Sequence, residues 1–346
     1  RIVVYKVGII GFGKMGMLHG ALLGGTRQTR IAAICDRSAV MRLGFKHIYK
    51  NVHVYSDAKK MFEKEQLDIV VVTTPTFNHE ESVRLALENG CAVFVEKPLA
   101  INTQQAEYIC KLAKEKKAVI QVGFCNRFLP SALQAERLLR CGRIGKPTHV
   151  SAVMFIGDVF EEHTGWRYKP ELSGGGALMD FGIHMIDLLI HYFGDVESVR
   201  GETKQLYSRL VEDEASAKIR FISGLECEFE TSWSKEAFRK SYSKMEITGE
   251  NGKMILTDQT LEVFDADGKK SEDYTYPDLY DGCFMDLGGL LYSYQMESFL
   301  RKINQESTGE TTEGCTPEQA LYVQKILESI YQSAREHREV KVSNNG

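Results

Sequence analysis

Three polar side chains that could move a proton, Asp180, His184 and Asp187, follow the glycine triplet Gly174–Gly176. Their spacing of four and then three residues places them on one face of a predicted helix. A histidine beside a carboxylate can accept a hydroxyl proton near neutral pH. His191 continues this face by one turn, which makes a metal site with Asp180 and His184 conceivable, but no further ligand follows at a metal-like spacing. We therefore predict acid–base chemistry without a metal, and a packed structural histidine is the competing interpretation.

A second pair of charged residues, Glu96 and Lys97, lies between the apolar run Cys91–Val95 and Pro98. The apolar run predicts a strand, and in open α/β sheets the carboxyl ends of the strands carry the ligand crevice. Pro98 keeps Lys97 extended and delays the start of a helix. A lysine there can donate to a substrate oxygen and stabilise negative charge on it. The competing interpretation is a solvated lysine at a strand end.

The segment Gly11-Phe12-Gly13-Lys14-Met15-Gly16 has the pattern G-x-G-x-x-G between a predicted strand and a predicted helix. In this context the first glycine permits a tight turn, the second lets the backbone approach a pyrophosphate, and the third lets the helix pack on the strand. The positive N-terminus of the helix then faces the phosphates. The segment predicts a dinucleotide-binding turn.

Asp36 ends the second predicted strand, 20 residues after Gly16. This spacing is typical of the carboxylate that accepts hydrogen bonds from the adenine ribose hydroxyls. A 2′-phosphate would meet a like charge there, so Asp36 favours NAD over NADP. Arg37 follows directly and could pair with a 2′-phosphate, which favours NADP.

The elements that position these motifs differ between the two halves of the chain. Residues 1–124 alternate short β-branched runs with helical patterns, which predicts a doubly wound parallel sheet. The predicted strands are Val3–Ile10, Ile31–Cys35, Asp68–Thr73, Cys91–Val95 and Ala118–Val122, and the predicted helices lie near 14–24, 57–65, 78–89 and 103–117.

After about residue 125 the pattern changes to helices near 128–140 and 176–193, a strand near 147–157, and mostly strands over 196–276. Alternating side chains and turn signals in the last range predict an antiparallel sheet. Helices near 285–304 and 317–336 and a strand at 340–342 close the chain. We therefore expect an α/β protein with a Rossmann domain at 1–124 and an α+β domain at 125–311, built on a large, mostly antiparallel open sheet.

Composition excludes several other classes of protein. The 346 residues, 43% hydrophobic and 26% charged, fit about two globular domains. A net charge of −4 argues against nucleic acid as the main partner, and no apolar run could span a membrane. The eight cysteines form no CxxC motif, and several lie in apolar strands, as reduced structural thiols do. With no signal-peptide pattern at the start, we expect a cytoplasmic protein.

Taken together and in this order, the motifs resemble those of the Gfo/Idh/MocA oxidoreductases over essentially the whole chain. The motifs are the glycine turn, His19, Thr74-Pro75 with His79, Glu96-Lys97-Pro98, Trp166-Arg167, and Gly-Gly-Gly-x-x-x-Asp-x-Gly-x-His-x-x-Asp. The resemblance implies that Lys97, Asp180 and His184 are catalytic. It also implies cofactor contacts from Gly11, Phe12, Gly13, Lys14, Met15, Gly16, Asp36, Arg37, Thr74, Pro75, His79, Glu96, Lys97, Trp166 and Arg167. One departure is Phe124-Cys125-Asn126-Arg127-Phe128, where many relatives carry Phe-Asn-Arg-Arg-Phe.

The function that the resemblance implies is NAD(P)-dependent hydride transfer at a hydroxyl carbon of a sugar, a cyclitol such as inositol, or a nucleotide sugar. In this scheme His184 accepts the proton of the substrate hydroxyl, Asp180 orients or charges His184, and Lys97 polarises the oxygen of that hydroxyl. One alternative is a glycosidase that oxidises a sugar transiently with bound NAD. The other is a regulator that binds NAD without catalysis.

The resemblance also implies two features of assembly. Residues 312–346 are expected to pack on the Rossmann domain, and members of the family commonly oligomerise through the C-terminal sheet. Phe221, Phe229, Trp233 and Ile247 lie on strands with few helices left to cover them. An exposed apolar sheet face usually marks an interface, so we expect a homodimer or homotetramer through this sheet.

Overall fold

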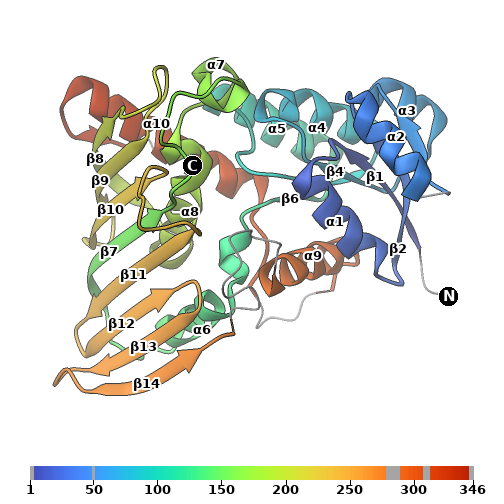
Figure 1. Ribbon diagram of the computed structural model, residues 1–346. Helices are drawn as coiled ribbons and strands as arrows, with labels where there is room; N and C mark the ends of the chain where they lie inside the picture. The colour runs from blue at the N-terminus through green and yellow to red at the C-terminus, as the bar shows by residue number, and fades with distance from the viewer. Residues whose placement is uncertain (1–3, 49–50, 278–288, 307–311, 343–346) are drawn as a thin grey trace. The chain divides into compact units, whose positions relative to one another are not determined.

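The computed structural model describes residues 4–48, 51–277, 289–306 and 312–342. These residues form two compact units (Figure 1): the described parts of 1–124 and 292–321 form unit 1, and the described parts of 125–291 and 322–346 form unit 2. Val3 of the first predicted strand and positions 285–288 of a predicted helix lie outside the described residues.

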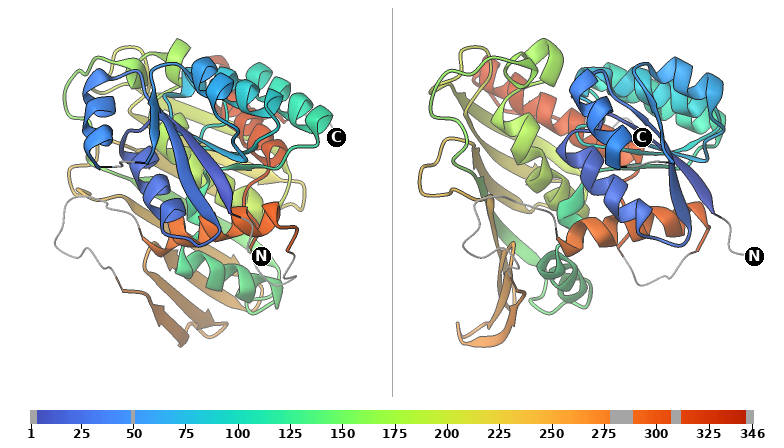
Figure 2. Two further views of the ribbon diagram at one scale, coloured as in Figure 1. Left: turned by 90° about the vertical axis from the view of Figure 1, so that its right-hand side faces the viewer. Right: turned by 45° about the vertical axis from the view of Figure 1, so that its right-hand side comes forward.

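Unit 1 is built on a six-stranded parallel sheet in the order β3-β2-β1-β4-β5-β6. Figure 2 shows helices on both faces of this sheet, α4 and α5 on one and α1 and α9 on the other. The elements are β1 (Tyr5–Ile10), α1 (Lys14–Gly24), β2 (Thr29–Cys35), α2 (Ala39–Ile48), β3 (His53–Tyr55), α3 (Ala58–Lys64), β4 (Ile69–Val72), α4 (His79–Glu88), β5 (Ala92–Val95), α5 (Thr103–Lys116) and β6 (Ile120–Val122). The predicted doubly wound sheet is confirmed, and α2 and β3 are additional elements.

The strands of unit 1 are apolar because helices cover them on both faces. All four residues of β4 are fully buried. Most of α9 (Leu290–Ile303) belongs to unit 1, where Phe299 packs against Phe94 with ring centroids 5.8 Å apart. The core therefore joins β5 to a helix some 200 residues later in the sequence.

Unit 2 is built on a nine-stranded sheet in the order β14-β13-β12-β11-β7-β10-β9-β8-β15, in which the β7–β10 pair is parallel and the other pairs are antiparallel. Its strands are β7 (Pro147–Phe155), β8 (Val196–Lys204), β9 (Glu214–Phe221), β10 (Glu226–Ser232), β11 (Tyr242–Gly249), β12 (Gly252–Thr257), β13 (Thr260–Asp265), β14 (Lys270–Thr275) and β15 (Val340–Lys341). Its helices are η2 (Cys125–Phe128), α6 (Pro130–Arg140), η3 (Trp166–Tyr168), α7 (Pro170–Ser173), the π-helical turn η4 (Leu178–Gly182), α8 (Ile183–Phe193) and most of α10 (Pro317–Glu336).

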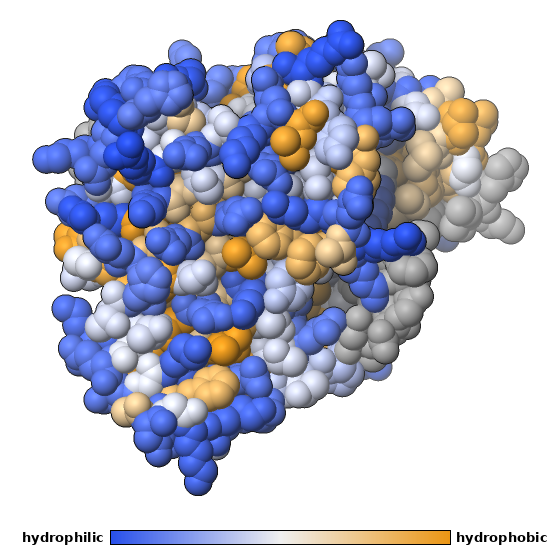
Figure 3. Space-filling model, turned by 60° about the vertical axis from the view of Figure 1, so that its left-hand side comes forward, coloured by the Kyte–Doolittle hydropathy of each residue, from blue (hydrophilic) through white to orange (hydrophobic). Residues whose placement is uncertain are grey.

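One face of this sheet is covered within the chain, which corrects the argument for an exposed apolar face. Phe221, Phe229, Trp233 and Ile247 are all at most 3% exposed. Phe193 of α8 packs edge-on against Phe221 with ring centroids 5.8 Å apart, and Tyr168 of η3 lies against Trp233 with ring centroids 5.6 Å apart. The opposite face carries charged cross-strand pairs such as Arg220 with Glu226, 2.9 Å apart. Figure 3 shows that face as polar residues interspersed with smaller hydrophobic areas.

The C-terminal segment is divided between the two units, whereas we expected 312–346 to pack on the Rossmann domain. Residues up to 321 cluster with unit 1, and residues from 322 cluster with unit 2. The hydroxyl of Tyr322 accepts a hydrogen bond from the Val196 amide at 2.8 Å, and β15 pairs with β8. Pairing of β15 with β8 therefore holds residues 340–341 at one edge of the sheet of unit 2.

Candidate functional site

The glycine turn of unit 1 joins β1 to α1 and has the conformation that an anion-binding turn requires. Gly11 has a φ of +86°, and a Cβ there would lie 2.7 Å from the Thr74 amide nitrogen. A Cβ on Gly16 would overlap the Gly11 carbonyl oxygen, whereas a Cβ on Gly13 would meet nothing within 4 Å. The first and third glycines are thus needed for backbone packing, and the second leaves open space next to the start of α1. This is the space that a pyrophosphate needs.

Asp36 is held against the same turn. Its carboxylate accepts hydrogen bonds from the Phe12 amide at 2.8 Å and from the Ser38 amide at 2.7 Å. Arg42 donates to the carbonyl oxygens of Asp36 and Arg37, at 2.8 and 2.7 Å. Side chain and backbone at the end of β2 are therefore both fixed, and the negative charge lies beside the glycine turn. The Arg37 side chain is exposed.

Thr74, Pro75 and His79 follow β4, at the same end of the sheet. The buried His79 ring lies 2.8 Å from the Pro98 carbonyl oxygen and 2.9 Å from that of Thr74. Burial lowers the pKa of His79, so the ring is neutral and can donate to one of these oxygens. His79 thus ties the ends of β4 and β5 together. The buried Thr74 hydroxyl has no hydrogen-bond partner among the described residues, so it can serve a bound group.

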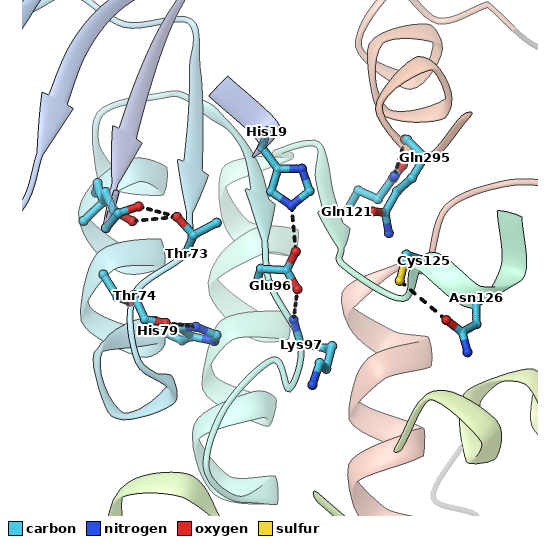
Figure 4. Close-up of polar contacts among 12 residues, drawn as sticks. His19, Thr73, Thr74, His79, Glu96, Lys97, Gln121, Cys125, Asn126 and Gln295 are labelled. Carbon is cyan, nitrogen blue, oxygen red and sulfur yellow. Dashed lines mark hydrogen bonds and ion pairs between the residues drawn. The ribbon is translucent and has the colours of Figure 1, made fainter. Parts of the chain in front are cut away.

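Glu96 and Lys97 follow β5, and Glu96 links Lys97 to α1 (Figure 4). One carboxylate oxygen lies 2.7 Å from Nε2 of the fully buried His19, and the other accepts from the Lys97 amide at 3.2 Å. A Cβ on Gly123 would lie 2.8 Å from this carboxylate, so glycine makes room for it. The sequence singled out His19 only as part of a motif, and it held no signal for the contact with Glu96, 77 residues later.

In unit 2 the predicted proton-transfer residues lie on the turn η4 and on α8. Asp180 is on η4, and its carboxylate accepts from Arg167 at 2.6 Å. The guanidinium of Arg167 also lies 3.4 Å from Asp158 and 5.6 Å from the centre of the Trp233 ring. His184 is partly buried in the first turn of α8. The structure thus gives Asp180 a cationic partner, Arg167, which the sequence interpretation had grouped with the cofactor contacts.

Asp187 does not share the environment of Asp180, although the helical spacing predicted a common face. Its carboxylate is 1% exposed and accepts two hydrogen bonds from Arg127, at 2.8 and 2.6 Å. The π turn that carries Asp180 has more residues per turn than an α-helix, so the spacing rule for a regular helix does not extend across it. The ion pair between Arg127 and Asp187 therefore connects α8 to η2.

The structure therefore places the predicted residues in two groups. Unit 1 holds one group at the carboxyl ends of its parallel strands, namely Gly11–Gly16, Asp36, Arg37, Thr74, Pro75, His79, Glu96 and Lys97. Unit 2 holds the other, namely Trp166, Arg167, Asp180 and His184. Among the described residues, no group of three or more His, Cys, Asp or Glu side chains is arranged to hold a metal ion. No helix in that part of the chain is long and apolar enough to cross a bilayer.

Comparison with known proteins identifies the family. Residues 5–124 match the NAD-binding Rossmann fold of the Gfo/Idh/MocA oxidoreductases, and residues 132–255 match the C-terminal domain of the same family. The chain belongs to this family and is an NAD(P)-dependent oxidoreductase. The glycine turn, with its open space at Gly13 and the unpartnered Thr74 hydroxyl, fits such a cofactor.

Several relatives cover most of the chain, among them the following two. The D-glucoside 3-dehydrogenase of Escherichia coli (strain K12) is 26% identical, with 95% of each chain covered. The scyllo-inositol 2-dehydrogenase (NADP(+)) IolU of Bacillus subtilis (strain 168) is 27% identical over 86% of this chain and 88% of its own. Among solved structures, levoglucosan dehydrogenase in complex with NADH and L-sorbose matches with a TM-score of 0.86 at 21% identity and covers 99% of each chain. This last likeness shows the shared fold.

Proposed function

We propose that the protein is an NAD-dependent dehydrogenase that oxidises a hydroxyl carbon of a sugar or cyclitol. The observation that carries this proposal is the set of named relatives over most of the chain, which are dehydrogenases of glucosides and inositols. The chain also carries Lys97 after β5 and Asp180 and His184 around the start of α8. In this proposal unit 1 binds the cofactor, and unit 2 binds the substrate.

The preference for NAD over NADP rests on the position of Asp36. Hydrogen bonds from the Phe12 and Ser38 amides hold its carboxylate beside the glycine turn. Fixed there, the negative charge favours ribose hydroxyls as ligands and repels a 2′-phosphate. One relative is NADP-dependent, so the preference is a property to be tested on this chain itself.

The bound nicotinamide supplies the hydride acceptor, and the protein supplies positioning and charge. His184 accepts the proton of the substrate hydroxyl, as a histidine can near neutral pH. Lys97 donates to the same oxygen and stabilises the negative charge that develops there. The Glu96 carboxylate, held by His19, fixes the Lys97 backbone. Arg167 donates to the Asp180 carboxylate near the start of the helix that carries His184.

A substrate screen tests this proposal directly. Purified protein is mixed with NAD or NADP and with scyllo-inositol, a methyl glucoside, D-apiose, levoglucosan or a nucleotide sugar, and absorbance is followed at the reduced nicotinamide band. Accumulation of NADH with a free sugar or cyclitol is the expected result. Release of an aglycone from the glucoside without accumulation of NADH would instead identify a glycosidase with transient oxidation. Cofactor binding without turnover of any of these compounds would contradict the proposal.

We also propose that the open face of the nine-stranded sheet joins copies of the chain into a homodimer or homotetramer. The four apolar residues first considered for this role are buried within the chain. The open face instead carries partly exposed Val153 and Ile255 among alternating charges. We expect light scattering at micromolar concentration to give a mass of two or four chains, and Ile255→Arg to lower it. A parent protein that is monomeric under these conditions contradicts this assembly.

A further inference from the structure

One buried carboxylate of unit 2 that the scheme above leaves unused belongs to Glu212, in the segment between β8 and β9. Glu212 is 6% exposed, and its carboxylate lies in contact with the glycine triplet before η4. It accepts hydrogen bonds from the Gly176 amide at 3.0 Å, from the Leu178 amide at 2.9 Å and from the Tyr331 hydroxyl at 2.8 Å. The Glu212 carbonyl oxygen accepts a fourth, from the Ala177 amide at 2.9 Å.

Through these contacts Glu212 alone accepts hydrogen bonds from three consecutive backbone amides, those of residues 176, 177 and 178. An amide at the start of a helix has no partner within the helix, so an external acceptor must satisfy it. A buried carboxylate is a strong acceptor for such amides, and its charge is favourable at the positive end of a helix. Glu212 therefore determines where the backbone enters η4.

This contact explains the glycine triplet. A Cβ on Gly176 would overlap the Glu212 backbone oxygen, and a Cβ on Gly175 would overlap the Tyr331 hydroxyl. Gly174 has a φ of +86°, which side chains rarely adopt. The glycines thus let Glu212 from the β8–β9 segment and Tyr331 from α10 approach the backbone closely.

Asp180 follows this segment directly. Its amide donates to the Gly176 carbonyl oxygen at 2.8 Å, so the two residues belong to the same hydrogen-bonded turn. The Leu178 amide that Glu212 holds lies two residues before Asp180, and His184 lies one turn beyond it on the same continuous helix. A displacement at Gly176 is therefore transmitted to Asp180 through a short, rigid stretch of backbone.

We propose that Glu212 is a positioning residue for proton transfer, because it fixes the backbone that carries Asp180 and His184. This inference rests on the proposed dehydrogenase function. Glu212 acts through residues 176–178, and Tyr331 supports it from α10. Misplacement of a reacting group by about 1 Å can cost about 10²-fold in rate, so loss of this contact should be visible in turnover.

The test compares Glu212→Gln with a matched control, Glu136→Gln. Glutamine has nearly the shape of glutamate, but it loses the charge and one of the two acceptor oxygens. Glu136 on α6 is also 6% exposed, and its carboxylate lies 3.2 Å from His191 near the other end of α8. Both changes weaken a buried contact to the same helical segment, and only Glu212 touches the end that leads to Asp180.

Three measurements are made on each variant. Steady-state kinetics with NAD and the fastest polyol from the substrate screen give kcat and KM, titration calorimetry gives the affinity for NAD, and hydrogen exchange with mass spectrometry follows the amides of residues 174–182. For Glu212→Gln we expect kcat to fall about 10-fold to 10²-fold, with KM and NAD affinity within about threefold of the parent. Exchange should accelerate in 174–182, and Glu136→Gln should keep kcat within about threefold.

The inference is overturned if folded Glu212→Gln turns over within about threefold of the parent, or if both variants lose activity equally. Should Glu212→Gln fail to fold, Tyr331→Phe removes one donor to the same carboxylate and should give a smaller loss of kcat with the same exchange pattern. A parent protein that oxidises none of the polyols refutes the proposed function. The exchange measurement then decides the positioning claim separately, because unchanged exchange in 174–182 overturns it.

Discussion

Removing one partner of the ion pair between Arg127 and Asp187 should destabilise the protein much more than removing both partners together. The guanidinium donates two hydrogen bonds to the carboxylate, at 2.8 and 2.6 Å, and the side chains are 3% and 1% exposed. Asp187→Asn leaves a buried cation without its counter-charge, which typically costs about 3–5 kcal/mol. The double variant Arg127→Met with Asp187→Leu replaces both charges by apolar groups and should recover most of that loss.

The chain offers a selective probe for this measurement. Both of its tryptophans, Trp166 and Trp233, belong to unit 2, so intrinsic fluorescence during urea unfolding reports on the unit that holds the pair. The midpoint and slope give the free energy of unfolding for each variant. Glu226→Gln is a control in the same unit, because it removes an exposed partner of Arg220 and should change the unfolding midpoint little.

The reasoning fails if Asp187→Asn loses less than about 1 kcal/mol, or if the double variant is as unstable as the single one. The first result would mean that the pair is accessible to water. The second would mean that packing volume rather than charge determines the stability at this site. Because Asp187 lies on α8 with His184, Asp187→Asn should also lower kcat, and the double variant should restore part of it.

Three further predictions concern single residues. Lys97→Ala and His184→Ala should each lower turnover by at least about 10²-fold while NAD affinity stays within about threefold, as single-turnover kinetics and calorimetry can show; a folded His184→Ala enzyme within about tenfold of the parent contradicts its role as base. Asp36→Ala should narrow the preference for NAD over NADP in calorimetric titrations, because a like charge opposite the 2′-phosphate is removed, and an unchanged ratio would leave Asp36 without a role in selection. Burial raises the pKa of Glu212 from its usual 4.5 to about 6, so the folded state holds this proton more tightly than the unfolded state does. The stabilisation from this bound proton is complete below about pH 4.5 and is lost as the pH rises through about 6. The free energy of unfolding of the parent, measured relative to that of Glu212→Gln, should therefore fall by about 2 kcal/mol between about pH 4 and pH 7. A difference between the two proteins that does not change with pH contradicts this prediction.

Sequence patterns predicted the architecture of both units where the elements are long or strongly apolar. The parallel strands of unit 1 are short apolar runs because helices cover both of their faces, and the sequence shows this directly. The sequence pattern did not predict α2 or β3. Gly44 interrupts the first, and the second is three residues long, which is too short for a periodicity to be visible.

Alternation along the strands of unit 2 correctly predicted a sheet with two different faces. It could not predict which face the chain itself covers, because the covering helices come from segments before and after the strands. Phe221 and Trp233 are alternating residues in the sequence, and they are buried because helices and loops of unit 2 pack over them. The prediction that they form an exposed apolar face was therefore wrong.

At the candidate site, the sequence by itself determined the features that depend on neighbouring residues. The glycine turn follows from the backbone freedom of Gly11, and the positions of Asp36 and Lys97 follow from their places directly after strands. Tertiary structure alone decided the partners of the charged groups. The carboxylate of Glu212 meets Gly176 and Tyr331, which are 36 and 119 residues away, and Arg127 meets Asp187 60 residues away. Local patterns carry backbone conformation and amphipathic faces, whereas the pairing of buried charges depends on which distant segments the folded core brings into contact.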